Sequence, residues 1–388
     1  MMNKIAFIIA AIILIVSCKK PFAPKGIQSS TGFLVVEGVI DPGGDTTRIK
    51  LSRVVKLDTV TTAPVTNALV FVEGMDNTTS QLNENAGGIY SLRLSLNNSQ
   101  KYRLHIRTAD GKDYKSDYVE VKVTPAIDAI NYTIKNNGLQ IILDTHDVTN
   151  NTRYYRWNYV ETWQFHSKYA SAYVSNGDSV IARTADQQVY YCYNSGNSNN
   201  ILLGSSAQLS QDVISAAPIA LVSPTSEKIE IKYSILINQY ALTSDAYNFW
   251  QNIKKNTEEL GSIFDAQPSE IAGNIHCTTN PDEPVIGYVS ASSFTSKRIF
   301  VDNSVLPTDW KPIYPNDCPT DSVFLEFNDG REYINQENQV FNYKKGGYSE
   351  IPITAIKSDK YGRGHLGAAP VCVDCTLRGT LKKPSFWQ

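Results

Sequence analysis

The sequence predicts a mainly β protein with two β-sandwiches, one packed helix and an irregular, disulfide-braced C-terminal lobe. Three observations support this prediction. Short apolar runs separated by turn residues recur from residue 33 onward, one helical pattern interrupts them near residues 245–260, and cysteines gather in the last third of the chain. Closely spaced short strands are typical of β-sandwiches. A chain of 388 residues is long enough for two or three domains.

The first 17 residues predict a secretory signal. Lys4 precedes an apolar run over residues 5–16, and the small residue Ser17 follows it. A basic start, a short apolar run and a small residue at the cleavage point define such signals. The run falls short of the roughly 20 residues that a spanning helix needs, although a short anchor that stays attached is the alternative. Ile15-Val16-Ser17-Cys18 resembles the lipobox of bacterial lipoproteins, which implies acylation of Cys18 and a tether over residues 18–31.

Residues 32–124 predict the first β-sandwich. Strands are expected at residues 33–40, 48–55, 68–72, 89–94, 102–107 and 114–123. Asp110-Gly111 is a strong hairpin signal between the last two of them. Thr124-Pro125 marks the boundary to a second domain over residues 125–300. There, Asn136-Asn137-Gly138 predicts a hairpin, residues 154–165 and 228–237 predict further strands, and residues 167–225 form a polar insertion.

One helix is expected near residues 245–260 of the second domain. Ser244 or Asp245 can cap its start, and Gly261 can end it. Tyr247, Trp250 and Ile253, continued by Leu260, form an apolar stripe that is expected to pack against the second sandwich. Residues 301–388 contain many Pro, Gly, Asn and Asp residues and predict the irregular C-terminal lobe.

The aromatic strand over residues 154–165 carries the candidate ligand-binding residues Trp157, Tyr159 and Trp163. Exposed Tyr and Trp side chains can stack on sugars or flat ligands. The alternative, which we favour, is that Trp157 and Trp163 fill the core of the sandwich, as tryptophan commonly does in such folds.

Five of the six cysteines remain after Cys18, and an exported protein meets an oxidising compartment that favours disulfides. An odd number leaves one thiol free, and the sequence does not choose the pairing. Cys372-x-x-Cys375 has three interpretations: a redox pair, half of a zinc site, or two cysteines in separate disulfides. Export favours the last of these. The candidates for disulfides are Cys192, Cys277, Cys318, Cys372 and Cys375.

The charge and the motifs exclude several functions. Removing Lys4 with the signal leaves 35 basic and 38 acidic residues, a net charge of −3. This charge lacks the excess of basic residues that is typical of nucleic-acid-binding proteins. The five histidines are scattered, and the sequence has no zinc-protease helix, nucleophile elbow or phosphate-binding loop. The sequence therefore predicts a protein that is not an enzyme and that uses no metal or cofactor.

Several ordered motifs resemble a Bacteroidetes family of envelope lipoproteins known as a domain of unknown function. They are Leu34-Val35-Val36-Glu37-Gly38, Tyr154-Tyr155-Arg156-Trp157, Phe249-Trp250, residues 256–265, Gly287-Tyr288 and Cys372-Val373-Asp374-Cys375 with residues 383–387. Residues 33–123 also resemble the immunoglobulin/transthyretin-like or carboxypeptidase-regulatory-like sandwich, through Val65-Thr66-Asn67-Ala68-Leu69-Val70, Gly88-Ile89-Tyr90 and Tyr102-Arg103-Leu104.

The resemblance implies a lipid-anchored protein of the outer membrane that assists nutrient uptake beside a TonB-dependent transporter, without catalysis. Members of this phylum often carry acidic residues after the lipidated cysteine, whereas Lys19-Lys20 follow Cys18, so the surface and the periplasmic face both stay open. The alternative function is an adhesin or a structural envelope protein that binds glycan or peptide.

Overall fold

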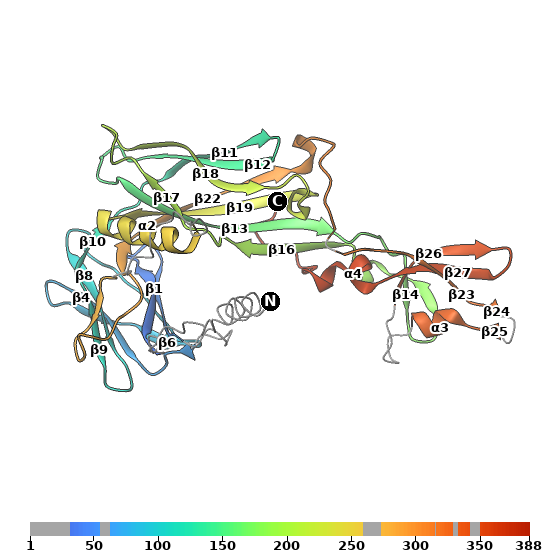
Figure 1. Cartoon of the computed structure of the whole chain (residues 1–388), viewed down its shortest axis with the longest axis horizontal. Coiled ribbons are helices and arrows are strands. Elements are labelled where there is room, and N and C mark those ends of the chain that lie inside the picture. Colours follow the sequence, from blue (N-terminus) through green and yellow to red (C-terminus); the bar gives the residue numbers. More distant parts are fainter. Residues whose placement is uncertain (1–31, 55–62, 259–272, 315, 329–332, 342–349) are drawn as a thin grey trace, which may run out of the picture.

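The computed structural model describes residues 32–54, 63–258, 273–314, 316–328, 333–341 and 350–388. The signal, Cys18 and the tether lie outside these residues, as do Leu260 and Gly261. Strands account for 48% of the residues that the structure describes and helices for 11%, which confirms the mainly β prediction. Figure 1 shows two β domains stacked across one helix, with a smaller lobe projecting from the second domain.

The first domain is a 12-stranded, nearly closed sheet around one core. Buried and exposed positions alternate along its strands, as in Leu69–Gly74, because successive side chains point to opposite faces of a sheet. Its strands are β1 Leu34–Ile40, β2 Thr46–Arg53, β3 Ala63–Pro64, β4 Leu69–Gly74, β5 Thr79–Gln81, β6 Asn83–Asn85, β7 Ile89–Arg93, β8 Lys101–Arg107, β9 Asp113–Ser116, β10 Val119–Lys122, β20 Ile275–Cys277 and β21 Ser290–Ser292.

The last two of these strands return from far along the chain, so the first domain is not limited to residues 32–124. Strand β21 lies parallel between β1 and β10, pairing Val39 with Ser290 and Val121 with Ala291. Strand β20 extends the sheet beside β9. Residues 275–291 also contribute apolar side chains to the first core. Part of the span expected for the second domain, residues 125–300, therefore belongs to the first domain.

The second domain is a sandwich of two sheets around the second core. A three-stranded sheet, β11-β12-β18, faces the sheet β16-β13-β19-β22, to which β17 is added. Strands β16 to β18 come from residues 167–225, so the expected polar insertion supplies much of this sandwich. The strands are β11 Ile127–Lys135, β12 Gly138–His146, β13 Tyr154–His166, β16 Tyr191–Asn197, β17 Leu202–Ser205, β18 Val213–Val222, β19 Lys232–Leu242 and β22 Phe294–Asp302.

The C-terminal lobe is more regular than its composition predicts. A three-stranded sheet, β23-β27-β26, forms its centre, and the hairpin β14-β15 from the expected insertion packs beside β26. Frequent Gly and Pro hid these strands because both residues weaken strand signals. The elements are β14 Tyr173–Ser175, β15 Val180–Ala182, β23 Asp321–Phe324, β24 Phe327–Asn328, β25 Tyr333–Ile334, β26 Ile351–Ser358, β27 Gly362–Ala368, α3 Gln336–Val340 and α4 Pro370–Val373. Short 3-10 turns cover Ala185–Gln187, Glu227–Ile229, Asn303–Val305 and Cys375–Leu377.

Helix α2, Ser244–Glu258, lies between the two domains (Figure 1). Its cap is Thr243, whose Oγ1 accepts a hydrogen bond from the Ala246 amide at 3.2 Å, and not Ser244 or Asp245. Ala246 and Phe249 are its buried residues, so the expected stripe is displaced by one position. The consequence is that Trp250 and Ile253 face a cleft between the domains. In the part of the chain that the structure describes, no helix is long and apolar enough to cross a membrane.

Candidate ligand-binding cleft

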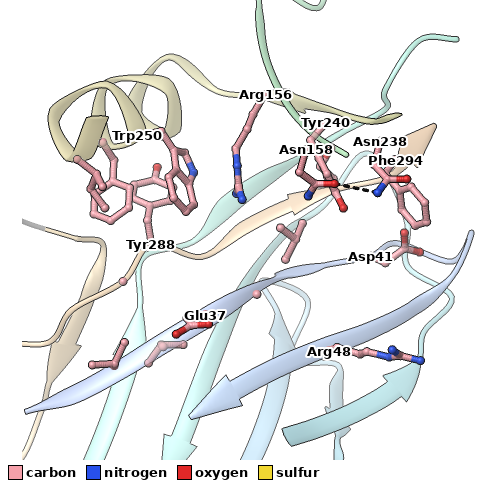
Figure 2. A pocket seen from close by; sticks show the side chains of 18 of the residues that line it. Glu37, Asp41, Arg48, Arg156, Asn158, Asn238, Tyr240, Trp250, Tyr288 and Phe294 are labelled. Atoms are coloured by element: carbon pink, nitrogen blue, oxygen red, sulfur yellow. Dashed lines mark hydrogen bonds between the residues drawn. The ribbon is translucent and has the colours of Figure 1, made fainter. Parts of the chain in front are cut away.

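A cleft of about 730 Å³ lies where the first domain, the second domain and α2 meet. Strands β1 and β2 form one wall, while β13, β19 and α2 form the other (Figure 2). The loop at residues 286–288, Ser292 at the end of β21 and Phe294 at the start of β22 complete the lining. Clefts of roughly 300–1,000 Å³ at domain interfaces are common ligand sites. We therefore take this cleft as the candidate functional site.

Arg156 brings a positive charge to the cleft. On β13, Tyr155 and Trp157 point into the second core, so the alternation of the strand turns Arg156 to the opposite side. Its guanidinium carbon lies 3.8 Å from the centre of the Trp250 ring. Burial lowers the pKa of the Arg156 guanidinium from its ordinary value. Among the described residues, no carboxylate pairs with Arg156, so a half-buried cation without a carboxylate partner lines the cleft.

Two asparagines lie beside Arg156 on the same wall. Asn158 and Asn238 are direct partners in the β13–β19 ladder. The Nδ2 of Asn238 donates a hydrogen bond to Oδ1 of Asn158 at 2.8 Å (Figure 2). Tyr240 and Phe294 follow on the neighbouring strands, with ring centres 5.8 Å apart. This wall therefore combines amide groups with aromatic surface.

Asp41 brings a negative charge from the opposite wall. Its side chain closes the turn after β1, because Oδ1 accepts hydrogen bonds from the amides of Gly43 at 2.8 Å and Asp45 at 2.9 Å. Asp41 is only 5% exposed, and its Oδ2 is buried without a hydrogen-bond partner in the described part of the chain. Burying a polar atom without a hydrogen-bond partner costs free energy, so a donor placed at this oxygen would be favourable.

The remaining charges of the cleft lie on β1 and β2. Glu37 pairs with Lys50 at 3.6 Å, so its charge already has a partner. Arg48 and Asp45 are exposed at the Asp41 end, where Arg48 pairs with neither carboxylate among the described residues. Gly287 lets the adjacent loop approach β1. Its φ is +140°, and a Cβ there would lie 2.2 Å from the carbonyl oxygen of Val36.

The predicted ligand residues of β13 lie on the other face of their strand. Trp157 is 2% exposed and Trp163 is 7% exposed, and both belong to the second core. The Nε1 of Trp157 donates a hydrogen bond to Oε1 of Gln239 at 2.8 Å. Tyr159 packs against the same core. The two tryptophans therefore fill the core, as the favoured interpretation of the sequence expects. The residues that line the cleft from this strand are Arg156 and Asn158, which lie between the core residues.

The cysteines form two disulfides, Cys192–Cys375 and Cys318–Cys372. Both cysteines of the C-x-x-C motif therefore join separate bridges, as one of its three interpretations predicts. Cys277 is free and buried, and it does not take part in a disulfide. Within the described ranges, no group of three or more His, Cys, Asp or Glu side chains is placed to hold a metal ion.

Comparison with known families decides the identity of the chain. The model of a family described as "Domain of unknown function (DUF4249)" matches residues 19–298. The chain belongs to this family. All cleft residues lie inside the DUF4249 match, whereas most of the C-terminal lobe and the motif at residues 372–387 lie beyond its end.

Other comparisons add little to the family assignment. No curated protein matches the DUF4249 chain. One similar solved structure is the adhesin InvE of Yersinia pseudotuberculosis, with 12% sequence identity and a TM-score of 0.14. The match covers 54% of this chain and 54% of the adhesin, so the chain spans about half the length of that structure.

Proposed function

We propose that this protein is a non-enzymatic binding lipoprotein of the cell envelope that holds a small ligand in the cleft between its two domains. The observation that carries the proposal is a pair of opposite charges that form no ion pair among the described residues, Arg156 on one wall and Asp41 on the other, whose Oδ2 has no hydrogen-bond donor. Folded proteins usually pair such groups, because a buried carboxylate oxygen without a donor and a partly desolvated cation without an anion both cost free energy. A ligand that supplies both partners would remove this cost.

A thermal-shift experiment tests the binding function. The protein without residues 1–18 is heated with fractions of small molecules from the growth medium. A ligand present at 100 times its Kd stabilises the folded state by about 2.7 kcal/mol, which raises the melting temperature. We expect Trp250→Ala to lose the shift, because it removes the aromatic support of Arg156. Phe386→Ala removes the matched arginine stack at Arg298 outside the cleft, and this control variant should keep the shift.

The proposal places the protein at the outer membrane, anchored through Cys18. The signal sequence and the lipobox resemblance support this location, and the two disulfides fit an oxidising compartment. Several buried acyl chains contribute about 0.8 kcal/mol per methylene, which is enough for stable anchoring. Mass spectrometry of the natural protein should show acyl groups on Cys18, and Cys18→Ser should remain unprocessed. A wild-type protein without acyl groups would contradict the anchor.

The proposed partner is a TonB-dependent transporter, to which the protein would present its ligand. The family resemblance and a transthyretin-like role of the first domain as a binding or spacer module support this partner. Co-purification in mild detergent under native expression tests it, and recovery of the lipoprotein without any transporter would count against it.

The second candidate function is an adhesin or structural role. The lobe that projects from the second domain favours this alternative, because most of it lies outside the DUF4249 match and two disulfides brace it (Figure 1). A deletion strain separates the two functions. A growth defect on one nutrient supports uptake, whereas normal growth together with binding to a glycan array supports adhesion.

A further inference from the structure

The Arg156 end of the cleft has the geometry of a carboxylate site. Trp250 stacks on the guanidinium at 3.8 Å, so it occupies one face of that group. The N–H donors of a guanidinium lie in its plane, and a ring on its face leaves them free. A planar fork of such donors matches the two oxygens of a carboxylate. This end therefore suits an anionic group that approaches in the plane of the guanidinium.

The Asp41 end has the geometry of a donor site. The turn holds the carboxylate in place through Oδ1, so the direction of Oδ2 is set before any ligand arrives. Oδ2 can accept only from a donor, and an ammonium group supplies both the proton and the opposite charge. Asp45 and Glu37 add negative charge to the same wall. The exposed cation Arg48 lies on this wall as well, and Lys50 pairs with Glu37, so the preference for an ammonium group rests on the buried Oδ2 of Asp41.

The asparagine pair lies on the wall that carries Arg156 and fits an amide group. The bond between the two side chains uses Nδ2 of Asn238 and Oδ1 of Asn158. It leaves Nδ2 of Asn158 as a donor and Oδ1 of Asn238 as an acceptor. A peptide unit offers the complementary carbonyl oxygen and N–H. The rings of Tyr240 and Phe294 supply apolar surface for a side chain.

From these three features we infer that the ligand of the cleft is a short peptide with free termini, its carboxylate on Arg156 and its ammonium group on Asp41. This inference rests on the proposed binding function and names its ligand class. It also explains why the two unpaired charges are opposite in sign and lie on facing walls (Figure 2).

Calorimetric titration with blocked and unblocked peptides tests the inference. The probes are peptides of two to five residues with one central Phe, each with free termini, with an acetylated N-terminus or with an amidated C-terminus. We expect the free form of at least one length to bind, and each block to weaken binding by about tenfold or more, which corresponds to about 1.4 kcal/mol.

Two variants assign each preference to one side chain. Asp41→Asn keeps the Oδ1 acceptor of the turn, and it should bind the free and the acetylated peptides equally well. Arg156→Gln should bind the free and the amidated peptides equally well. Asp76→Asn changes another turn aspartate, whose Oδ1 accepts from the Thr78 amide at 3.0 Å. Arg298→Gln changes an arginine stacked 3.6 Å from the Phe386 ring. Both control variants should keep the wild-type preferences.

Several results would overturn the inference. Equal binding of free and blocked peptides by the wild type would do so, as would preferences that survive in Asp41→Asn or Arg156→Gln. If no peptide binds while a growth-medium fraction still gives the shift that depends on Trp250, the peptide inference fails and the binding function stands. If neither peptides nor fractions bind, both proposals fail together.

Discussion

Breaking the Cys192–Cys375 disulfide should destabilise the second domain more than any other single cross-link removal. The bridge joins β16 to the 3-10 turn that follows α4, and both cysteines are fully buried. Its residues are separated by 183 positions. Cross-linking a loop restricts the unfolded chain, and a loop of this length gives about 5 kcal/mol in the chain-entropy estimate.

The second disulfide changes this magnitude little. Cys318 and Cys372 lie within the larger loop and are 54 positions apart, so an intact inner bridge shortens the outer loop to 183 − 54 = 129 positions. The dependence on length is logarithmic, and the loss stays at about 5 kcal/mol. Removing Cys318–Cys372 alone should cost about 4 kcal/mol. Folded domains have only about 5–15 kcal/mol of stability in total, so either loss is large.

The assay is urea unfolding followed by tryptophan fluorescence. All five tryptophans lie between residues 157 and 387, so none belongs to residues 32–124, although Trp250 lines the cleft that faces them. The paired variant Cys192→Ala with Cys375→Ala should unfold at a much lower urea concentration than the wild type. The variant Cys318→Ala with Cys372→Ala is the matched control and should shift less. An unchanged midpoint for the first variant, or the reverse order of the two, would refute the reasoning.

Three further predictions concern single residues. His105 contacts Glu73 and Asp113 at 2.6 Å each; burial opposes ionisation of these carboxyls, but hydrogen bonds with His105 lower both pKa values. The stability that these two carboxylates contribute is present above their unfolded pKa values of about 4, and it is lost as the pH falls through the lower pKa values of the folded protein. The substitution His105→Leu should lower the free energy of unfolding by about 3 kcal/mol at neutral pH. Near-UV circular dichroism in urea measures both effects. Gly204→Ala should lower the free energy of unfolding, followed by fluorescence, by about 2 kcal/mol, because the new Cβ would lie 2.3 Å from the Trp157 ring. Gly196→Ala is the control and should cost under about 0.5 kcal/mol, because its Cβ would lie 3.7 Å from the Trp163 ring. Cys277 is 2% exposed, so a thiol reagent should label one cysteine per chain without residues 1–18 in denaturant and almost none in the native protein; rapid native labelling would contradict its burial.

Local patterns predicted the strands well, because alternation and turn residues are properties of short segments. The Asp110-Gly111 turn between β8 and β9 is one example, with Gly111 at a φ of +83°. Strand β21 had no such signal. Its sequence Ser-Ala-Ser carries no hydrophobic alternation, and its partners β1 and β10 lie far away in the chain. A pairing of that kind depends on the fold of the whole first domain.

The helix shows where a local pattern is ambiguous. Its span was predictable, yet Phe249 and Trp250 are adjacent aromatic residues, and both fit an apolar stripe. Ala246 and Phe249 are the buried residues of the helix, and Trp250 lines the cleft beside Phe249 with a more exposed side chain. The small side chain of Ala246 gave no hint of this choice. Sequence alone therefore assigned to the core the residue that supports Arg156.

The cleft itself was beyond sequence analysis because its two charges come from different domains. Alternation along β13 could have placed Arg156 opposite Trp157 once the tryptophan was assigned to the core. Nothing local showed that Asp41 keeps one buried oxygen without a partner, since that depends on the turn after β1 and on the facing wall. The site arises from the way that the two domains and α2 meet.

Native mass spectrometry tests the central claim, a ligand held in the cleft, most directly. The protein is purified from its own envelope in mild detergent, together with the variants Trp250→Ala and Phe386→Ala. We expect a small-molecule adduct on the wild type and on Phe386→Ala that is absent from Trp250→Ala. An adduct of the same mass and abundance on all three proteins, or no adduct on the wild type, would contradict this claim.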